Sequence, residues 1–221
     1  MQSSTGRLKD ELVKVVFASL ENRNDSAAFA HLGQQIEQLE PAQAVDASTN
    51  PTVDRWLESA VAASPEHLSE LANLLLAATS ELPWLRSYEN LPSSPERDAF
   101  QQHYSFELFA GPTFRGNEPP FAHDDLLVGF TLQAPNITYP PHHHEAPEIY
   151  GVISGELQWQ VGDQWRKAGP GDVIVHRPHE SHSMVTGDQP VLTWVAWPHS
   201  PHCKVHMPSL DGPGAVPPTI Y

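Results

Sequence analysis

A group of histidines and one glutamate between residues 142 and 182 is the part of the sequence best suited to chemistry. His142 and His144 are two residues apart, so their side chains fall on one face of an extended strand. Glu148 and Tyr150 have the same spacing, and His182 follows Glu148 by 34 residues, at the start of another predicted strand. Three imidazoles and one carboxylate bind divalent first-row transition metals and leave positions open for substrate or water. We therefore predict that His142, His144, Glu148 and His182 bind one metal ion.

The remaining residues of this region add no further ligand to the prediction. Strand alternation turns His143 away from its two neighbours, and His176 and His179 are left without an assigned role. Cys203 is the single cysteine, and no thiol chemistry is required of it. The ligand set does not distinguish zinc, iron, manganese, cobalt and nickel, because all accept imidazole and carboxylate.

Composition excludes several classes of partner. Lys and Arg total 12 against 27 Asp and Glu, a formal net charge of −15. This charge disfavours nucleic acids and anionic membranes, which are bound by cationic surfaces. The N-terminus lacks the uninterrupted apolar stretch of a secretory signal, and no run of about 18 apolar residues is present to span a membrane. We expect a cytoplasmic protein with a small-molecule substrate.

The elements that must position these residues divide the chain into four parts. Residues 1–80 show the 3.6-residue apolar period of four short amphipathic helices, with Asn50-Pro51 and Ser64-Pro65 as predicted helix starts. Residues 81–125 are a proline-rich transition with one predicted strand at 104–109. Residues 126–205 contain many short β-type runs separated by turns such as Ser154-Gly155 and Gly162-Asp163, which indicate a small β-barrel. Residues 206–221 are predicted to be an irregular tail, and the apolar helical faces are compatible with a homodimer.

The histidine segment and its surroundings resemble the two motifs of the cupin superfamily. His142-x-His144-x-x-x-Glu148 followed by Gly155 resembles the first motif, and Gly171-Asp172 followed by His182 resembles the second. The turn residues depart from the pattern, since Asn136 and His179 stand where the motifs usually have glycine, and Arg177 replaces a proline. The resemblance covers about residues 127–197. It implies a mainly β fold, a small jelly-roll barrel, with the helical N-terminus as an extension.

A closer resemblance rests on two tyrosines. Tyr139 lies three residues before His142, and Tyr150 lies two after Glu148. This arrangement is similar to that of the cupin-type dimethylsulfoniopropionate (DMSP) lyases, and the length and helical extension look most like the DddL type. The resemblance implies a carbon–sulfur lyase that cleaves DMSP to dimethyl sulfide and acrylate. It also carries the metal-ligand roles onto the four residues above and catalytic roles onto Tyr139 and Tyr150.

The residues fit the chemistry of such an elimination. A metal-bound carboxylate stabilises the charge that develops when the α-proton is removed. Tyrosine is a poor base at its ordinary pKa of about 10, but a nearby cation favours the phenolate, so Tyr150 is the predicted base and Tyr139 its partner. Aromatic faces attract a sulfonium group; the tryptophans at predicted barrel positions are Trp159, Trp194 and Trp197. The cations that could hold a carboxylate are Arg166, Lys167, Arg177 and Lys204.

Two other functions remain open from the sequence. A cupin dioxygenase could use the same three-histidine, one-glutamate site with O₂. A non-catalytic cupin binding or sensor protein could use the metal only to stiffen the barrel. Release of dimethyl sulfide without oxygen distinguishes the lyase from both.

Overall fold

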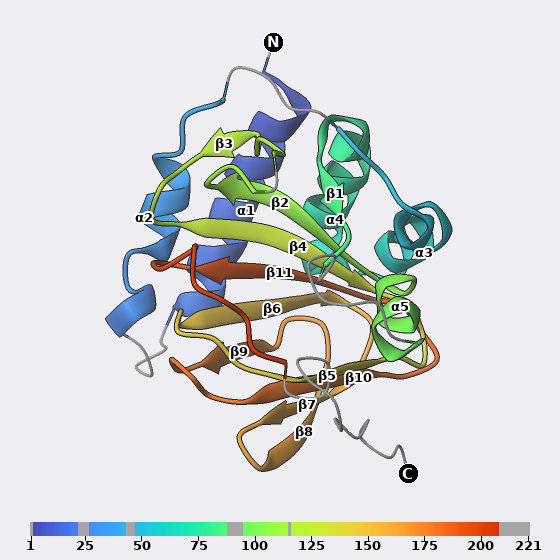
Figure 1. Cartoon of the computed structure of the whole chain (residues 1–221). Coiled ribbons are helices and arrows are strands. Elements are labelled where there is room, and N and C mark those ends of the chain that lie inside the picture. The colour runs from blue at the N-terminus through green and yellow to red at the C-terminus, as the bar shows by residue number, and fades with distance from the viewer. Residues whose placement is uncertain (1, 22–26, 43–46, 88–94, 115, 208–221) are drawn as a thin grey trace.

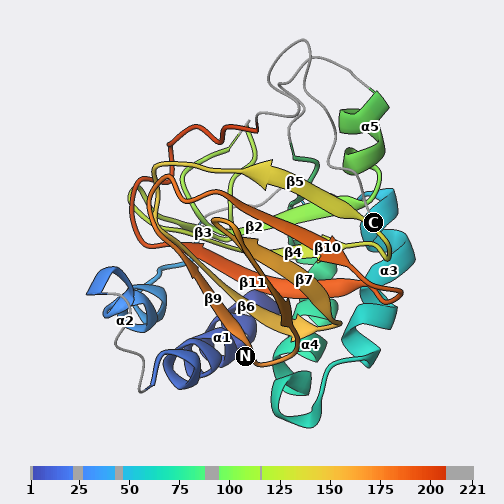
Figure 2. The ribbon, with the colours of Figure 1, turned by 90° about the horizontal axis from the view of Figure 1, so that it is seen from below.

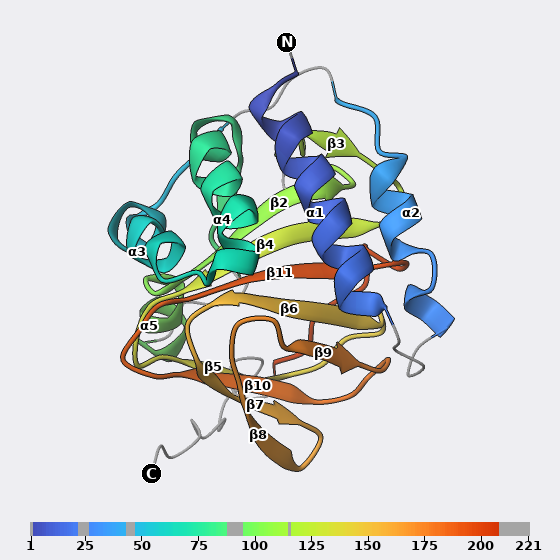
Figure 3. The same ribbon diagram turned by 180° about the vertical axis from the view of Figure 1, so that it is seen from behind.

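The computed structural model describes residues 2–21, 27–42, 47–87, 95–114 and 116–207. Two β-sheets face each other, and the N-terminal helices cover the outer face of the larger sheet (Figure 1). Helices α1 and α4 lie directly on this face when the molecule is seen from behind (Figure 3). The predicted fold class, a mainly β barrel with a helical N-terminal extension, is confirmed. Among the described residues, no helix is both long enough and apolar enough to cross a membrane.

The helices begin where the sequence provides capping groups. Ser3 accepts a hydrogen bond from the Gly6 amide at the start of α1, and Asn50 accepts from two amides at the start of α3, ahead of Pro51. The described helices longer than one turn are α1 (Ser4–Leu20), α2 (Leu32–Glu37), α3 (Pro51–Ala62), α4 (Glu66–Ala78) and α5 (Pro95–Gln101).

The start of α4 differs from the prediction by one residue. Ser64 was expected to cap this helix, but its hydroxyl donates to the Val61 carbonyl at 2.6 Å and so closes the end of α3. The cap position of α4 is Pro65, and the helix begins at Glu66. No side chain of the described residues caps the first amides of α4, since the Ser64 hydroxyl is directed back at α3.

The larger sheet has seven strands in the order β1-β2-β4-β11-β6-β9, with β3 paired to β2. Three of these strands, rather than one, come from the proline-rich transition. The strands are β1 (Trp84–Leu85), β2 (Tyr104–Gly111), β3 (Phe121–Ala122), β4 (Leu127–Gln133), β6 (Glu148–Ser154), β9 (Val173–His176) and β11 (Val191–Trp197).

The smaller sheet lies across the larger one when the molecule is seen from below (Figure 2). Its order is β5-β10-β7-β8. The predicted two-residue turn at Gly162-Asp163 joins β7 to β8, with Gly162 at a φ of 56°. The strands are β5 (Thr138–His142), β7 (Leu157–Val161), β8 (Gln164–Ala168) and β10 (His182–Thr186).

The apolar side chains form two cores on opposite faces of the larger sheet. One core lies between this sheet and the helices, and the other fills the space between the two sheets. Strand β6 serves both, because Ile149 and Ile153 face the helices while Tyr150 and Val152 face the barrel interior. Residues that follow Glu148 by an even number of positions are thereby directed into the barrel. Of the predicted tail, 208–221 lies outside the described residues.

Candidate metal centre

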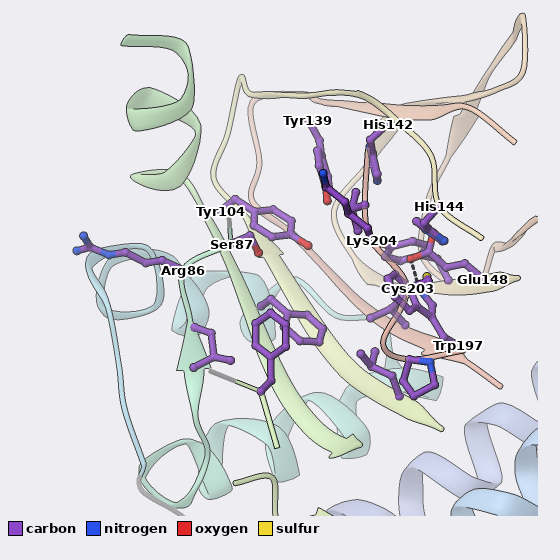
Figure 4. Close-up of a pocket in the computed structure, with 18 residues that line it drawn as sticks. Arg86, Ser87, Tyr104, Tyr139, His142, His144, Glu148, Trp197, Cys203 and Lys204 are labelled. Atoms are coloured by element: carbon purple, nitrogen blue, oxygen red, sulfur yellow. Dashed lines mark hydrogen bonds and ion pairs between the residues drawn. The ribbon is translucent and has the colours of Figure 1, made fainter. Parts of the chain in front are cut away.

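His144, Glu148 and His182 form a compact metal-binding group inside one end of the barrel. One potential ligand atom from each lies within 4.8 Å of the others, and all three residues are buried. Glu148 is the first residue of β6 and His182 the first of β10, while His144 lies in the connection that precedes β6. Strands of two different sheets therefore bring together residues that are far apart in the sequence; Figure 4 shows His144 and Glu148 of this group.

Both histidines of this group direct Nε2 at its centre and Nδ1 at a backbone carbonyl. Nδ1 of His144 lies 2.9 Å from the Ala146 carbonyl, and Nδ1 of His182 lies 2.9 Å from the Glu180 carbonyl. A carbonyl only accepts, so Nδ1 of each ring carries a hydrogen, and Nε2 is the nitrogen that offers a lone pair to a metal when the ring is neutral. Neither Nε2, though buried, has a hydrogen-bond partner among the described residues. This donor set fits a divalent transition-metal ion.

The charge on Glu148 completes the fit. Its Oε2 lies 3.4 Å from His144 Nε2 and 3.1 Å from His182 Nε2. Burial alone would raise the pKa of Glu148, but the charge of His144 holds it well below the usual range. Burial likewise acts to lower the pKa of His144, and the facing carboxylate overcomes this and raises it to about 10. In the metal-free protein, a proton on His144 thus balances the negative charge of Glu148, and a bound metal ion replaces this proton.

His142 lies beside this group and not within it. Its Nδ1 bonds the Pro140 carbonyl at 2.9 Å, so its Nε2 is left unprotonated. Direct pairing of β5 with β10 places its ring 4.0 Å from that of His182, and the ring stacks on Tyr139 at 4.0 Å. Burial and the proximity of His182 lower the pKa of His142 well below its ordinary value. His142 is thus a neutral, buried neighbour of the three grouped residues.

His176 is the buried residue that the sequence left without a role. Its Nδ1 lies 2.8 Å from Glu148 Oε2, and the indole of Trp159 donates to its Nε2 at 3.0 Å. Burial, followed by the proximity of His182, lowers the pKa of His176 to about 3, so the ring is neutral. Trp197 donates to the other oxygen of Glu148, Oε1, at 2.7 Å. Only the pairing of strands reveals these contacts, since nothing in the local sequence marks them.

The outer histidines take no part in the group. His143 turns away, as predicted, and stacks on His206 with 5.3 Å between the ring centroids. His179 adopts a φ of 63°, and Asn136 a φ of 57°. These are left-handed conformations that glycine favours, so both residues keep the backbone shape of the glycines they replace in the motifs.

A cavity of about 290 Å³ opens onto the metal-binding group. The buried side chains of Tyr139 and Tyr150 line it together with His142, His144 and Glu148. The volume suits a small molecule. The two tyrosines therefore line the same cavity as His144 and Glu148.

The structure separates the three tryptophans that were considered for the cavity wall. Trp197 lines the cavity. Trp159 is fully buried in the barrel interior, where its ring lies 5.0 Å from that of Tyr150. Trp194 faces the helices on the other side of the sheet, against Gly151, where a Cβ would lie 2.1 Å from the indole nitrogen. Trp194 therefore packs the helical core and does not contribute to the site.

Of the four cations considered for binding a carboxylate, only Lys204 lines the cavity. In Figure 4 its side chain extends toward Tyr139, whereas Arg86, which also borders the cavity and was not considered, extends away from the metal-binding group. Cys203 lies at the same rim, and its sulfur accepts a hydrogen bond from the Ala146 amide at 3.4 Å. The segment that carries Cys203 and Lys204 is fixed to the barrel by mutual backbone hydrogen bonds between His143 and His206.

Two facing sheets with a histidine–glutamate group buried between them define a cupin-type barrel with a candidate metal centre. The family model of dimethylsulfoniopropionate lyase matches residues 22–193, so the chain belongs to this family. Curated relatives include a Cereibacter sphaeroides protein named for DMSP lyase DddL, 33% identical over 129 residues (58% of this chain and 50% of that protein). The Ruegeria pomeroyi DMSP lyase DddQ is 35% identical over 92 residues, which are 41% of this chain and 46% of that protein. The matches thus span about half the length of each relative.

Solved structures agree with the fold. The crystal structure of DMSP lyase DddQ from Ruegeria pomeroyi superposes with a TM-score of 0.74 at 22% identity, covering 93% of this chain and 98% of that one. A structure from the work on DMSP lyases RdDddP and RnDddQII gives a TM-score of 0.71 at 20% identity, covering 92% and 97%. The helical extension and the barrel therefore both occur in solved proteins of the same architecture.

Proposed function

We propose that this protein is a metal-dependent lyase that cleaves DMSP by β-elimination to dimethyl sulfide and acrylate. The observation that carries the proposal is one cavity lined by two buried tyrosines and two members of a buried histidine–glutamate metal-binding group. Membership of the DMSP lyase family supports the choice of substrate. His144, Glu148 and His182 are the proposed ligands, and His142, whose ring lies 4.0 Å from that of His182, is the proposed fourth.

The metal supplies Lewis acidity, which stabilises negative charge as it develops beside the substrate carboxylate. Tyr150 takes the α-proton on its phenolate oxygen. The electrons of the broken C–H bond form the new double bond of acrylate, and the electrons of the C–S bond leave with sulfur as neutral dimethyl sulfide. Tyr150 suits this task because it follows Glu148 by two residues on the interior face of β6 and is buried beside the cavity.

The zwitterionic substrate is held at its two charged ends. Lys204 is positioned to attract the carboxylate at the cavity rim. The rings of Tyr104 and Tyr139, 4.9 Å apart, offer aromatic faces to the sulfonium. Tyr139 also orients His142 by stacking on it. The aromatic wall excludes water from the reacting carbons, which strengthens the electrostatic interactions there.

The experiment that tests the proposal measures dimethyl sulfide released from DMSP under anaerobic conditions. The protein is assayed as purified, after chelation, and after restoration with Zn²⁺, Fe²⁺, Mn²⁺, Co²⁺ or Ni²⁺ in separate samples. We expect oxygen-independent release that chelation abolishes and at least one of these ions restores. Equal release in all samples would exclude the metal, and absence of release under every condition would exclude the lyase. Product formation only with oxygen would instead identify a dioxygenase.

A further inference from the structure

The carboxylate of Glu148 is hydrogen-bonded on both of its oxygens by buried side chains outside the metal-binding group. His176 donates to Oε2 at 2.8 Å, and Trp197 donates to Oε1 at 2.7 Å. His176 is itself bonded at Nε2 by the indole of Trp159, at 3.0 Å. A chain of hydrogen bonds therefore runs from Trp159 through His176 to Glu148, and a separate bond from Trp197 reaches its other oxygen.

The strand order of the larger sheet produces this arrangement. Strand β6 lies between β9 and β11, and Glu148 pairs directly with His176 on β9. On the other side Ala196 pairs with Ile149, so Trp197 is brought next to Glu148. Each flanking strand thus contributes one donor to the carboxylate.

Trp159 determines which nitrogen of His176 carries the hydrogen. An indole N–H can only donate, so Nε2 of His176 must accept. In the neutral ring the hydrogen is then on Nδ1, where it donates to Glu148. His176 consequently has no lone pair to offer a metal ion, although its ring stacks on that of His182 with 3.7 Å between centroids.

We propose that His176, supported by Trp159, and Trp197 are positioning residues that hold Glu148 with Oε2 directed at the metal-binding group. Oε2 is the oxygen that faces the Nε2 atoms of His144 and His182. The bond from Trp197 holds Oε1 while Oε2 faces these nitrogens, so in this proposal Glu148 binds the metal through Oε2 alone. Binding through one oxygen keeps one coordination position for the substrate. The inference rests on the metal centre of the proposed function, but not on the identity of the substrate.

Two variants of His176 separate hydrogen bonding from ring packing. His176→Asn removes the ring but keeps an N–H donor near the position of Nδ1, whereas His176→Phe keeps a ring against His182 and removes the donor. Both leave the Trp159 indole without its acceptor, so they are matched in that respect. Zinc affinity is measured by competition with a chromophoric chelator, starting from the Zn²⁺-loaded protein, and thermal unfolding of the metal-free forms is the control.

We expect His176→Phe to weaken zinc binding about 10–100-fold, the usual effect of losing a residue that orients a ligand. His176→Asn should bind zinc nearly as tightly as the wild type. Wild-type zinc affinity in His176→Phe would overturn the proposal, because the hydrogen bond to Glu148 would then have no effect on metal binding. An equal loss in both variants would also overturn it, because the packing of the ring would then account for the role of His176.

The variants of two tryptophans on β11 test the second donor independently. The ring centroids of Trp197 and His144 lie 4.3 Å apart. Trp197→Phe keeps a ring against His144 but removes the hydrogen bond to Oε1 of Glu148. We expect weaker zinc binding and a weaker visible absorption of the Co²⁺-loaded protein, because a carboxylate bound through both oxygens raises the coordination number. Trp194→Phe, on the helical face of the same strand, is the control and should change neither. An unchanged cobalt spectrum in Trp197→Phe would contradict the assignment.

The zinc measurements need no turnover, so they distinguish this inference from the proposed function. An active wild type whose His176→Phe variant binds zinc normally refutes the positioning role alone. A wild type that binds zinc but never releases dimethyl sulfide refutes the lyase and leaves the positioning role standing.

Discussion

At the scale of single residues, the site pairs three imidazoles with backbone carbonyls that fix which ring nitrogen faces the metal-binding group. His142, His144 and His182 each direct Nδ1 at a carbonyl two residues away, at 2.9 Å. The local backbone therefore orients three Nε2 atoms for a metal, and the metal displaces the extra proton of His144 when it binds. This preparation reduces the ordering cost of metal binding, because the rings need not reorient.

The first prediction at this scale concerns the proposed base. We expect Tyr150→Phe to lower kcat for DMSP cleavage about 10²–10⁴-fold, the usual contribution of a general base, while metal content stays at the wild-type level. Activity and metal content are measured on the same preparation. Full turnover would refute the role of Tyr150, and joint loss of activity and metal would make it a ligand or a structural support.

The second prediction concerns the proton on His144. Its pKa of about 10 means that the metal-free protein holds this proton at neutral pH. The metal must displace it, so affinity should rise as pH increases and level off near pH 10, by about tenfold per unit for one proton. Calorimetry of Zn²⁺ binding in buffers of different ionisation enthalpy counts the protons released. An affinity that is constant between about pH 7 and 9 would contradict this coupling.

At the scale of elements, strand register assembles the site. Pairing of β5 with β10 brings His142 opposite His182, and pairing of β6 with β9 brings His176 opposite Glu148. A shift of one residue in either pairing would turn these side chains to the other face of the sheet. The two buried faces of β6 protect this register, because a slip by one residue would exchange Ile149 and Ile153 of the helical core with Tyr150 and Val152 of the barrel core.

A buried carboxyl group on β2 leads to the third prediction. Glu107 faces the helical core, and neither of its oxygens has a hydrogen-bond partner among the described residues. Burial raises the pKa of Glu107 well above the usual value, so the folded protein keeps its proton. As pH rises above the ordinary value of about 4.5, the unfolded chain loses this proton and the wild type loses stability.

Glu107→Gln should remove this dependence, since the amide is neutral at every pH. We expect the free energy of unfolding of the variant to exceed that of the wild type by about 1–3 kcal/mol at pH 8, with a smaller difference at pH 4. Urea denaturation at both pH values measures it. Glu58→Gln, an exposed change on α3, is the control for net charge. A constant difference between the two pH values would show that Glu107 does not titrate on unfolding.

At the scale of the whole molecule, the helices and the barrel share one sheet. Residues of α1, α3 and α4 pack against the outer face of strands whose inner face lines the barrel. The Asn50 cap of α3 also bonds Ser105 on β2, at 2.7 Å. The extension is therefore part of the structure that supports the site, and its removal would expose a large apolar surface.

This shared core leads to the fourth prediction. We expect the helices and the barrel to unfold in one cooperative transition, because neither can lose its packing without exposing the core of the other. Far-ultraviolet circular dichroism follows the helices, and tryptophan fluorescence follows Trp159, Trp194 and Trp197. Coincident urea transitions are expected. Fluorescence that stays native after the helical signal is lost would show that the barrel is stable by itself.

Local spacing in the sequence determined the amphipathic helices and the short strands of the barrel, whereas the cupin fold and the roles of the two tyrosines were predicted from the family resemblance. Residues two apart on a strand share a face, so His142 could be grouped with His144, and Glu148 with Tyr150, before any tertiary contact was known. Asn136 and His179 depart from the glycines of the cupin motifs, yet their positive φ values preserve the loops.

Only the tertiary structure decided which distant residues complete the site. His176 and Trp197 reach Glu148 because β9 and β11 flank β6, and Lys204 is separated from the other three cations because its segment crosses the cavity rim. Trp159 and Trp194 were indistinguishable in the sequence but occupy different cores. The physical reason is that the order and register of strands are set by the packing of the whole chain, whereas the sequence pattern specifies only which face of a strand a residue occupies.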